Sequence, residues 1–123
     1  MAKKVLIVED NANNMMLEKD LLEVAGFEVL QAVNATLGIE LARKEKPDVI
    51  VMDVRLPDMR GTEAVKILRQ SNETSGIPVV FVTASVMAEG LEEVKATPNS
   101  AYISKPIDTH TFAKKVGENI KNV

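Results

Sequence analysis

The feature that most constrains the fold of this chain is a regular alternation of short β-rich runs with longer stretches of helical periodicity. Such alternation is typical of α/β domains with a parallel sheet. The runs with strand character are residues 4–9, 28–32, 49–53, 78–83 and 101–104. The first, third and fourth are nearly all apolar, which indicates burial on both faces, whereas the second alternates like a strand nearer an edge. The sequence therefore predicts a five-stranded parallel sheet between helices.

Each run is followed by a stretch that predicts a helix. In the first stretch the stripe expected to face the sheet consists of Leu17, Leu21, Val24 and Ala25. Gly26 follows at the place where a C-terminal cap belongs. The other helices are predicted near residues 35–46, with Asn34 as N-cap, near 62–70, at 86–95 and from residue 108 onward. The helix at 86–95 has the weakest pattern of the five.

Size and composition exclude several classes of protein. A chain of 123 residues with 46% hydrophobic and 27% charged residues has the character of one soluble domain. No apolar run is long enough to span a bilayer, and no signal peptide is recognisable. A net charge of -3 provides no long-range attraction for nucleic acid, and the lack of cysteine fits a reducing compartment. We expect a cytoplasmic domain, residues 1–123, that neither enters membranes nor binds DNA directly.

Chemically active residues follow the predicted strands. Glu9 and Asp10 close the first, Asp53 the third and Thr83 the fourth, and Lys105 follows the fifth. The carboxyl ends of parallel strands form the ligand crevice of such sheets, so these side chains should meet. Three carboxylates repel one another unless a cation is present, and oxygen ligands suit Mg²⁺ or Mn²⁺. Lys105 and the Thr83 hydroxyl offer the charge and the hydrogen bond that a phosphoryl group needs.

Four segments in this order carry a resemblance to a known family. They are VLIVEDN at residues 5–11, MDVRLPDMRG at 52–61, VTA at 82–84 and AYISKPI at 101–107. Together they resemble the response-regulator receiver domain of two-component systems, and the chain is most similar to stand-alone receivers. The resemblance covers essentially the whole chain. It implies a flavodoxin-like doubly wound sheet with strand order 2-1-3-4-5 and five helices.

The resemblance also implies roles for the acidic residues. Asp53 would be the phosphoacceptor, with its carboxylate acting as the nucleophile toward a phosphohistidine. Asp10 and Asp53 would bind Mg²⁺ directly and Glu9 through water, while the backbone carbonyl of Arg55 would complete the protein ligands. Asp10 has a structural alternative, because together with Asn11 it would also serve as a helix N-cap.

The remaining site residues would form a switch. Lys105 and Thr83 would each hold a phosphoryl oxygen, and Tyr102 would then swing inward to fill the space that Thr83 leaves. The readout face would comprise the fourth helix, the fifth strand and the fifth helix. The resemblance further implies a cis peptide bond between Lys105 and Pro106.

The implied partners are a phosphoryl donor and a downstream protein. The donor would be a histidine kinase or a histidine phosphotransfer protein, docking on Asn14, Met15, Glu18 and residues 106–107 at the mouth of the cleft. The chain would not be an enzyme acting on a separate substrate. Two alternatives remain at this point. An aspartyl phosphatase of the haloacid-dehalogenase type needs a second Asp where this chain has Arg55, and a pseudo-receiver would keep the fold without phosphorylation.

Overall fold

The computed structural model describes residues 2–83 and 91–120. In chain order the elements are β1 (Lys4–Val8), α1 (Ala12–Val24), β2 (Glu28–Ala32), α2 (Ala35–Glu45), β3 (Val49–Asp53), α3 (Gly61–Arg69), β4 (Val79–Thr83), α4 (Leu91–Ala96), β5 (Ser100–Ser104) and α5 (Phe112–Glu118). The strands form one sheet in the order β2-β1-β3-β4-β5, and all neighbouring strands are parallel. The predicted fold class and strand order are therefore confirmed. Residues 84–90, which hold the predicted start of the fourth helix at Val86, lie outside the described residues.

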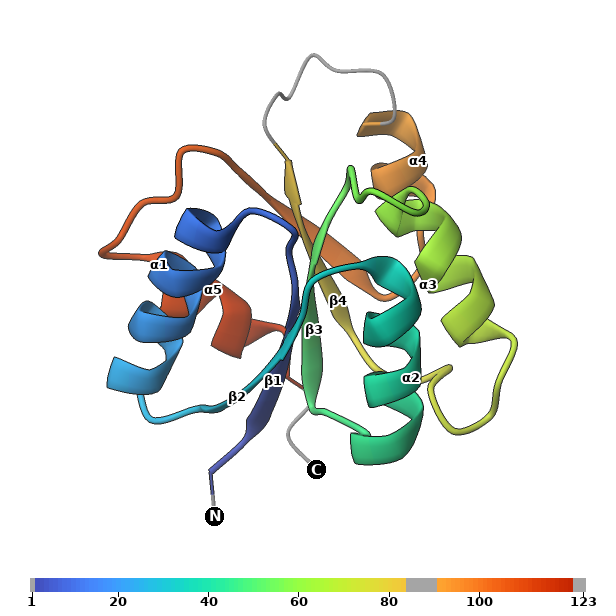
Figure 1. The fold of residues 1–123 in the computed structure, drawn as a ribbon, viewed down its shortest axis with the longest axis horizontal. Helices are drawn as coiled ribbons and strands as arrows, with labels where there is room; N and C mark the ends of the chain where they lie inside the picture. The colour runs from blue at the N-terminus through green and yellow to red at the C-terminus, as the bar shows by residue number, and fades with distance from the viewer. Residues whose placement is uncertain (1, 84–90, 121–123) are drawn as a thin grey trace.

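The helices cover the two faces of the sheet in separate layers. Helices α1 and α5 lie on one face, and α2, α3 and α4 lie on the other (Figure 1). Strands β1, β3 and β4 are buried on both faces, as their apolar runs predicted. Leu6, Ile50 and Phe81 belong to the core beneath α2, α3 and α4, while Val5 and Val51 belong to the core beneath α1 and α5. None of the described helices is long and apolar enough to cross a membrane.

The face of α1 that packs on the sheet differs from the predicted one. Its buried residues are Met15, Glu18 and Leu22, whereas Leu17 is 38% exposed and Val24 is 89% exposed. Leu21 of the predicted stripe packs partly buried against the core, but the rest of the stripe was wrong. A glutamate occupies the middle of the true stripe, so the purely apolar pattern pointed to a rotated face. The predicted cap at Gly26 is confirmed, with φ at 97° and the Phe27 N–H bonded to the Leu22 carbonyl.

Helix α5 begins later than predicted. The expected start at Asp108 is a turn instead, in which the Asp108 carbonyl accepts hydrogen bonds from the N–H groups of Thr111 and Phe112. The helix then runs from Phe112, and its inner side is formed by Phe112, Val116 and the following Ile120, all of them buried. The turn lengthens the loop between β5 and α5 beside the functional edge of the sheet.

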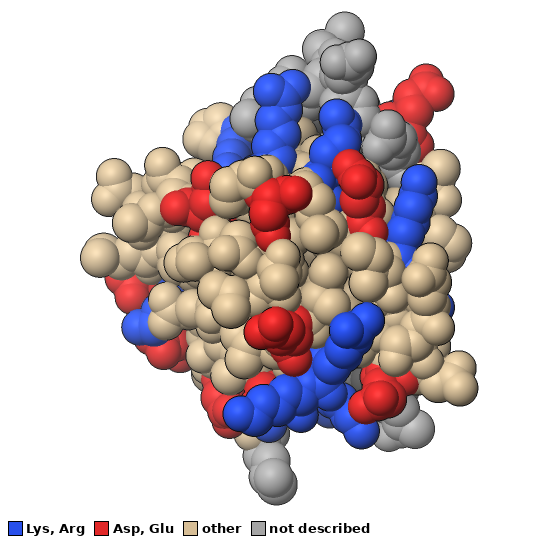
Figure 2. All heavy atoms as spheres, turned by 45° about the vertical axis from the view of Figure 1, so that its right-hand side comes forward, with Lys and Arg blue, Asp and Glu red and all other residues tan. Residues whose placement is uncertain are grey.

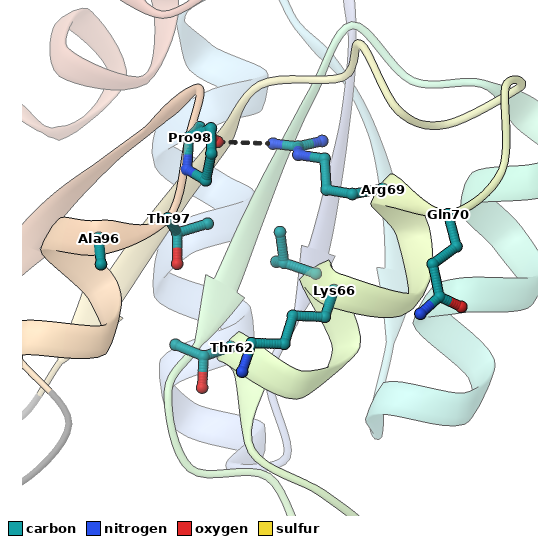
Figure 3. Close-up of a pocket in the computed structure, with 8 residues that line it drawn as sticks. Thr62, Lys66, Arg69, Gln70, Ala96, Thr97 and Pro98 are labelled. Atoms are coloured by element: carbon teal, nitrogen blue, oxygen red, sulfur yellow. Dashed lines mark hydrogen bonds between the residues drawn. The ribbon is translucent and has the colours of Figure 1, made fainter.

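A hollow of about 500 Å³ separates α3 from the segment that joins α4 to β5 (Figure 3). The Arg69 guanidinium at the end of α3 donates from Nη1 to the Ile77 carbonyl at 2.6 Å and from Nη2 to the Pro98 carbonyl at 3.3 Å. Asn99, which follows Pro98, has a φ of 57°, a left-handed conformation that asparagine tolerates. These contacts join the end of α3 to the start of β5, and the residues lining the hollow include none of the predicted site residues.

Charges on the face covered by α2, α3 and α4 are of mixed sign. Figure 2 shows Lys and Arg side chains at the upper and lower margins of this face, with Asp and Glu side chains beside them. On α2, Arg43 and Lys44 occupy the last turn, where they complement the partial negative charge of the helix end. The pattern is that of a solvated surface.

Candidate functional site

The predicted site residues meet at the carboxyl edge of the sheet. Glu9 directly follows β1, and its N–H bonds to the Ala32 carbonyl at 3.0 Å, which keeps the chain in line with β2. Asp53 ends β3 and Thr83 ends β4. The Lys105 N–H bonds to the Thr83 carbonyl at 2.7 Å, so the β4–β5 ladder extends to the lysine. Backbone pairing therefore sets the position of each side chain at this edge.

Three carboxyl groups form the centre of the site. Glu9, Asp10 and Asp53 each place an oxygen within 4.8 Å of the others. Glu9 is buried, Asp53 is partly exposed and Asp10 is exposed. The Lys105 ammonium lies 3.3 Å from Glu9 Oε1 and 3.6 Å from Asp53 Oδ2. One lysine does not balance three acids, so the donor set and its excess negative charge fit a divalent cation of the Mg²⁺ or Mn²⁺ type.

Burial and mutual repulsion change the acidity of these groups. Burial, followed by the charge of Glu9, raises the pKa of Asp53 to about 6, and Lys105 opposes that rise. Burial would also raise the pKa of Glu9, but the hydrogen bond from the Asn11 N–H and the charge of Lys105 outweigh it and lower the pKa. For Lys105, the two acids outweigh burial and raise the pKa. At neutral pH the site thus holds an ionised Asp53 against a charged lysine.

Asp10 does not serve as the helix cap. The Asn11 side chain accepts the Asn14 N–H at 3.0 Å and caps α1. Asp10 instead projects toward the cleft as the most exposed member of the acidic group. The helix-capping role that the sequence allowed for Asp10 therefore belongs to Asn11, and the Asp10 carboxylate remains available to a cation.

The loop after β3 is held by two contacts. Gly61 begins α3 so close to β3 that a Cβ there would clash with the Asp53 carbonyl oxygen. Asp58 bonds to the N-terminus of α2, accepting from the N–H of Ala35 at 2.9 Å and from the N–H and hydroxyl of Thr36 at 2.8 and 2.6 Å. The hydrogen bonds from Thr36 and Ala35 lower the pKa of Asp58 to about 2. The backbone of Arg55 lies in this loop, and its N–H bonds to Asp53 Oδ1 at 3.3 Å.

The two predicted switch residues lie on neighbouring strands. Thr83 is 7% exposed at the end of β4, and Tyr102 is 41% exposed on the edge strand β5, where it pairs with Phe81. The Tyr102 ring thus begins from the outward position that the predicted switch requires. The Lys105–Pro106 peptide bond is cis, as predicted.

The predicted docking surface needs a correction. Met15 and Glu18 are 7% and 1% exposed, so neither presents its side chain to a partner. The surface next to the cleft is instead a groove of about 440 Å³ lined by Asn14, Leu17, Lys105, Pro106 and Ile107. The error follows from the rotated face of α1, which brings Leu17 outward and turns Met15 and Glu18 inward.

Glu18 is a site neighbour that the sequence did not reveal. Burial, followed by the charge of Glu9, raises the pKa of Glu18 to about 8. The charges of Asp53 and Lys105 also affect its pKa, and its side chain is buried. The sequence signal that could have indicated its burial is its spacing. Met15 lies three residues before it and Leu22 four residues after it, which places all three side chains on one face of the helix.

Known proteins with related sequences and folds agree with this architecture. A family model described as response regulator receiver domain matches residues 5–117. The polar-differentiation response regulators DivK of Brucella anthropi and Brucella ovis are 41% and 40% identical over 116 residues, which are 94% of this chain and 94% of theirs. The chemotaxis response regulator CheY4 of Vibrio cholerae superimposes with a TM-score of 0.90 at 29% identity, covering 98% of this chain and all of that one. The chain therefore belongs to the response-regulator receiver domain family of two-component signalling.

Proposed function

We propose that this receiver is a phosphoryl-accepting switch and that Asp53 is the residue phosphorylated. The observation that carries the proposal is the position of Asp53, which is partly exposed among the acids and has its Oδ2 3.6 Å from the Lys105 ammonium. A carboxylate oxygen of Asp53 would attack the phosphorus of a phosphohistidine. The P–N bond breaks, its electron pair passes to the histidine nitrogen, and an acyl phosphate forms.

The neighbouring residues have separate tasks in this proposal. Lys105 moves from the carboxylates to a phosphoryl oxygen, and the Thr83 hydroxyl bonds to another. Glu9, Asp10 and Asp53, together with the backbone carbonyl of Arg55, would hold Mg²⁺ or Mn²⁺, which supplies positive charge to the transferring group. The chain promotes only its own phosphotransfer and dephosphorylation, and we propose that residues 1–123 act as one receiver domain.

Incubation with acetyl phosphate and Mg²⁺, followed by intact-mass measurement, tests the proposal. We expect the protein to gain the mass of one phosphoryl group and to keep this group through the measurement. An aspartyl phosphatase would release phosphate continuously, and a pseudo-receiver would gain no mass. The family shown by the comparisons disfavours the phosphatase, as does Arg55 in the position where that class needs an acid.

We further propose that the phosphoryl donor, a histidine kinase or histidine phosphotransfer protein, docks in the groove beside Lys105. Leu17 lies in this groove and Val24 lies two turns further along α1, and both are exposed apolar residues. We expect Leu17→Glu to slow transfer from the cognate kinase by about 10-fold, because one misplaced interface charge costs about 1 to 2 kcal/mol. Labelling by acetyl phosphate should remain normal, since this small donor needs no groove.

The matched control for the docking groove is Val24→Glu. It adds the same charge to the same helix outside the groove and should leave kinase transfer unchanged. Rates from purified phosphorylated kinase measure both variants. Equal slowing by both substitutions, or by neither, would contradict docking at this groove.

A second prediction concerns the switch, whose readout we place on α4, β5 and α5. Thr83→Ala should accept phosphate but fail to draw Tyr102 inward, because the hydroxyl that turns toward the phosphoryl group is missing. Wild type should change its affinity for a downstream partner by roughly 5- to 150-fold on activation, the range of typical coupling free energies. Titration of that partner with and without beryllofluoride and Mg²⁺ measures the change. Thr83→Ser keeps the hydroxyl and should still switch, so a full response in Thr83→Ala would disprove this route.

A further inference from the structure

The hollow between α3 and the segment that joins α4 to β5 shares no residue with the acidic site. Its volume is about 500 Å³, a size typical of binding pockets. Val65 and Thr62 of α3 line it and are buried, at 0% and 1% exposure. Lys66, Ala96 and Pro98 also line it and are exposed. The hollow therefore has a buried floor and opens to solvent.

Hydrogen bonds to backbone carbonyls hold the two sides of the hollow in place. The Arg69 side chain crosses from α3 toward Pro98 (Figure 3). Its Nη1 donates to the Ile77 carbonyl at 2.6 Å, and its Nη2 donates to the Pro98 and Asn99 carbonyls, each at 3.3 Å. The Asn99 side chain in turn donates to the Gly76 carbonyl at 3.2 Å. Because these contacts already fix both walls, an occupant would not have to order them.

The charges that line the hollow are of one sign. Lys66 and Arg69 are basic, and no Asp or Glu stands among the described lining residues. Lys66 has no ion-pair partner within residues 2–83 and 91–120, Glu63 one turn earlier included. The acceptors of the Arg69 guanidinium in the described part of the chain are carbonyls, and its buried Nε has no hydrogen-bond partner there. Two positive charges thus stand without an acidic partner, although the chain has a net charge of -3.

We propose that this hollow is a docking site for a short acidic segment of a partner protein. The segment would place an apolar side chain over Val65 and a carboxylate beside Lys66 and Arg69. The apolar side chain follows from the buried floor and from the exposed carbon surface of Ala96 and Pro98, and the carboxylate follows from the unpaired positive charge.

A protein segment fits the hollow better than a free small molecule does. Pockets for small molecules bury most of the ligand surface, whereas an open hollow covers only part of its occupant. Contacts around the rim must then contribute to binding, as they do around an anchor side chain in a protein interface. The docking site is independent of the phosphorylation of Asp53, so it can be tested on the unphosphorylated protein.

NMR titration of the full chain with capped synthetic peptides tests the proposal. One peptide has a central leucine flanked by glutamates, and its twin has lysines in place of the glutamates. The acidic peptide should shift the amide signals of Lys66, Gln70 and Ala96, and the basic peptide should leave them in place. Lys66→Glu should weaken binding of the acidic peptide by about 10-fold and should allow the basic peptide to bind.

The matched control is Lys114→Glu, at an exposed position of α5 on the other face of the sheet. It makes the same change in net charge and should bind the acidic peptide as wild type does. Equal weakening by Lys66→Glu and Lys114→Glu would overturn the proposal, because it would indicate a general effect of net charge. The absence of shifts at the hollow, or equal shifts with both peptides, would also overturn it. Octanoate serves as a free carboxylate probe, and binding as tight as that of the acidic peptide would show a small-molecule site instead of a protein docking site.

Discussion

Asp53→Asn is expected to abolish phosphorylation by both acetyl phosphate and the cognate kinase, while the domain stays folded. The amide cannot act as the nucleophile, and Glu9, which also lies beside Lys105, is buried and so is not accessible to a phosphoryl donor. Intact mass after incubation with acetyl phosphate and Mg²⁺ should show no adduct. Asp20→Asn, at an exposed position of α1, is the control and should be labelled like wild type. A phosphate adduct on Asp53→Asn formed at the wild-type rate would show that the assignment is wrong.

The same substitution should raise stability at neutral pH in cation-free buffer. The pKa of Asp53 is raised from 3.8 to about 6, so the folded protein binds this proton more tightly than the unfolded chain does. Its contribution to the free energy of unfolding is then fully present below pH 3.8 and is lost as pH rises through about 6. At pH 7 the asparagine variant does not lose this contribution. We expect its free energy of unfolding to exceed that of wild type by only about 1 to 2 kcal/mol, because the variant also gives up the ion pair with Lys105.

Urea unfolding in chelator at several pH values checks the sign of this effect. The stability difference between Asp53→Asn and wild type should be largest near pH 7 and shrink toward acidic pH, where the wild-type carboxyl is protonated. Added Mg²⁺ should reduce the advantage of the variant at neutral pH, since the cation relieves the repulsion that the substitution removes. A difference that grew on acidification would contradict the proposed repulsion between Asp53 and Glu9.

Asp10→Ala is expected to cause the second large loss, because it removes the most accessible ligand of the proposed cation. We expect Mg²⁺ affinity and phosphotransfer to fall on the order of 100-fold, in line with the several kcal/mol that a metal ion contributes to such reactions. In excess chelator, the rate of phosphotransfer to the wild-type protein should fall to about the rate of Asp10→Ala. Mg²⁺ titration and the initial rate of labelling by acetyl phosphate measure the two effects.

Asn11→Ala is the matched control for Asp10→Ala. It removes the N-cap hydrogen bond to Asn14 and should lower stability by about 1 kcal/mol without weakening Mg²⁺ binding. Asp10→Ala should show the reverse pattern, with little change in stability and a large loss of binding. If Asp10→Ala merely destabilised the protein, or if transfer continued at full rate in excess chelator, the cation site would be wrongly assigned.

Much of the fold was predictable because patterns over a few neighbouring residues indicate where the strands lie and how deeply they are buried. Nearly uniform apolar runs predicted the buried strands β1, β3 and β4, and the alternating run predicted a strand nearer the edge, which β2 is. The candidate site was predictable for a related reason. The carboxyl ends of parallel strands lie at one edge of the sheet, so topology brings together Glu9 after β1, Asp53 at the end of β3 and Lys105 after β5.

Contacts between distant segments were not predictable in the same way. Asp58 bonds to the start of α2 across 22 and 23 positions in the sequence, and no local pattern connects these segments. The late start of α5 was not predictable either. Asp108 is a residue type that often caps a helix, but here its carbonyl accepts the hydrogen bonds of a turn that precedes the helix. Helix ends depend on the geometry with which the preceding loop leaves the sheet, and only the packed structure supplies that geometry.

By itself, the sequence determined the strands, their apolar cores and the polar residues at their carboxyl ends, because alternation and capping act over a few residues. Only the tertiary structure decided which face of α1 packs on the sheet. That decision turned Leu17 toward the surface and buried Glu18, although hydrophobicity favoured the opposite arrangement. The physical reason is that the environment of a helical side chain depends on the elements packed against it. The packing of α1 buried Glu18 near Glu9, and both the burial and the charge of Glu9 raise the pKa of Glu18.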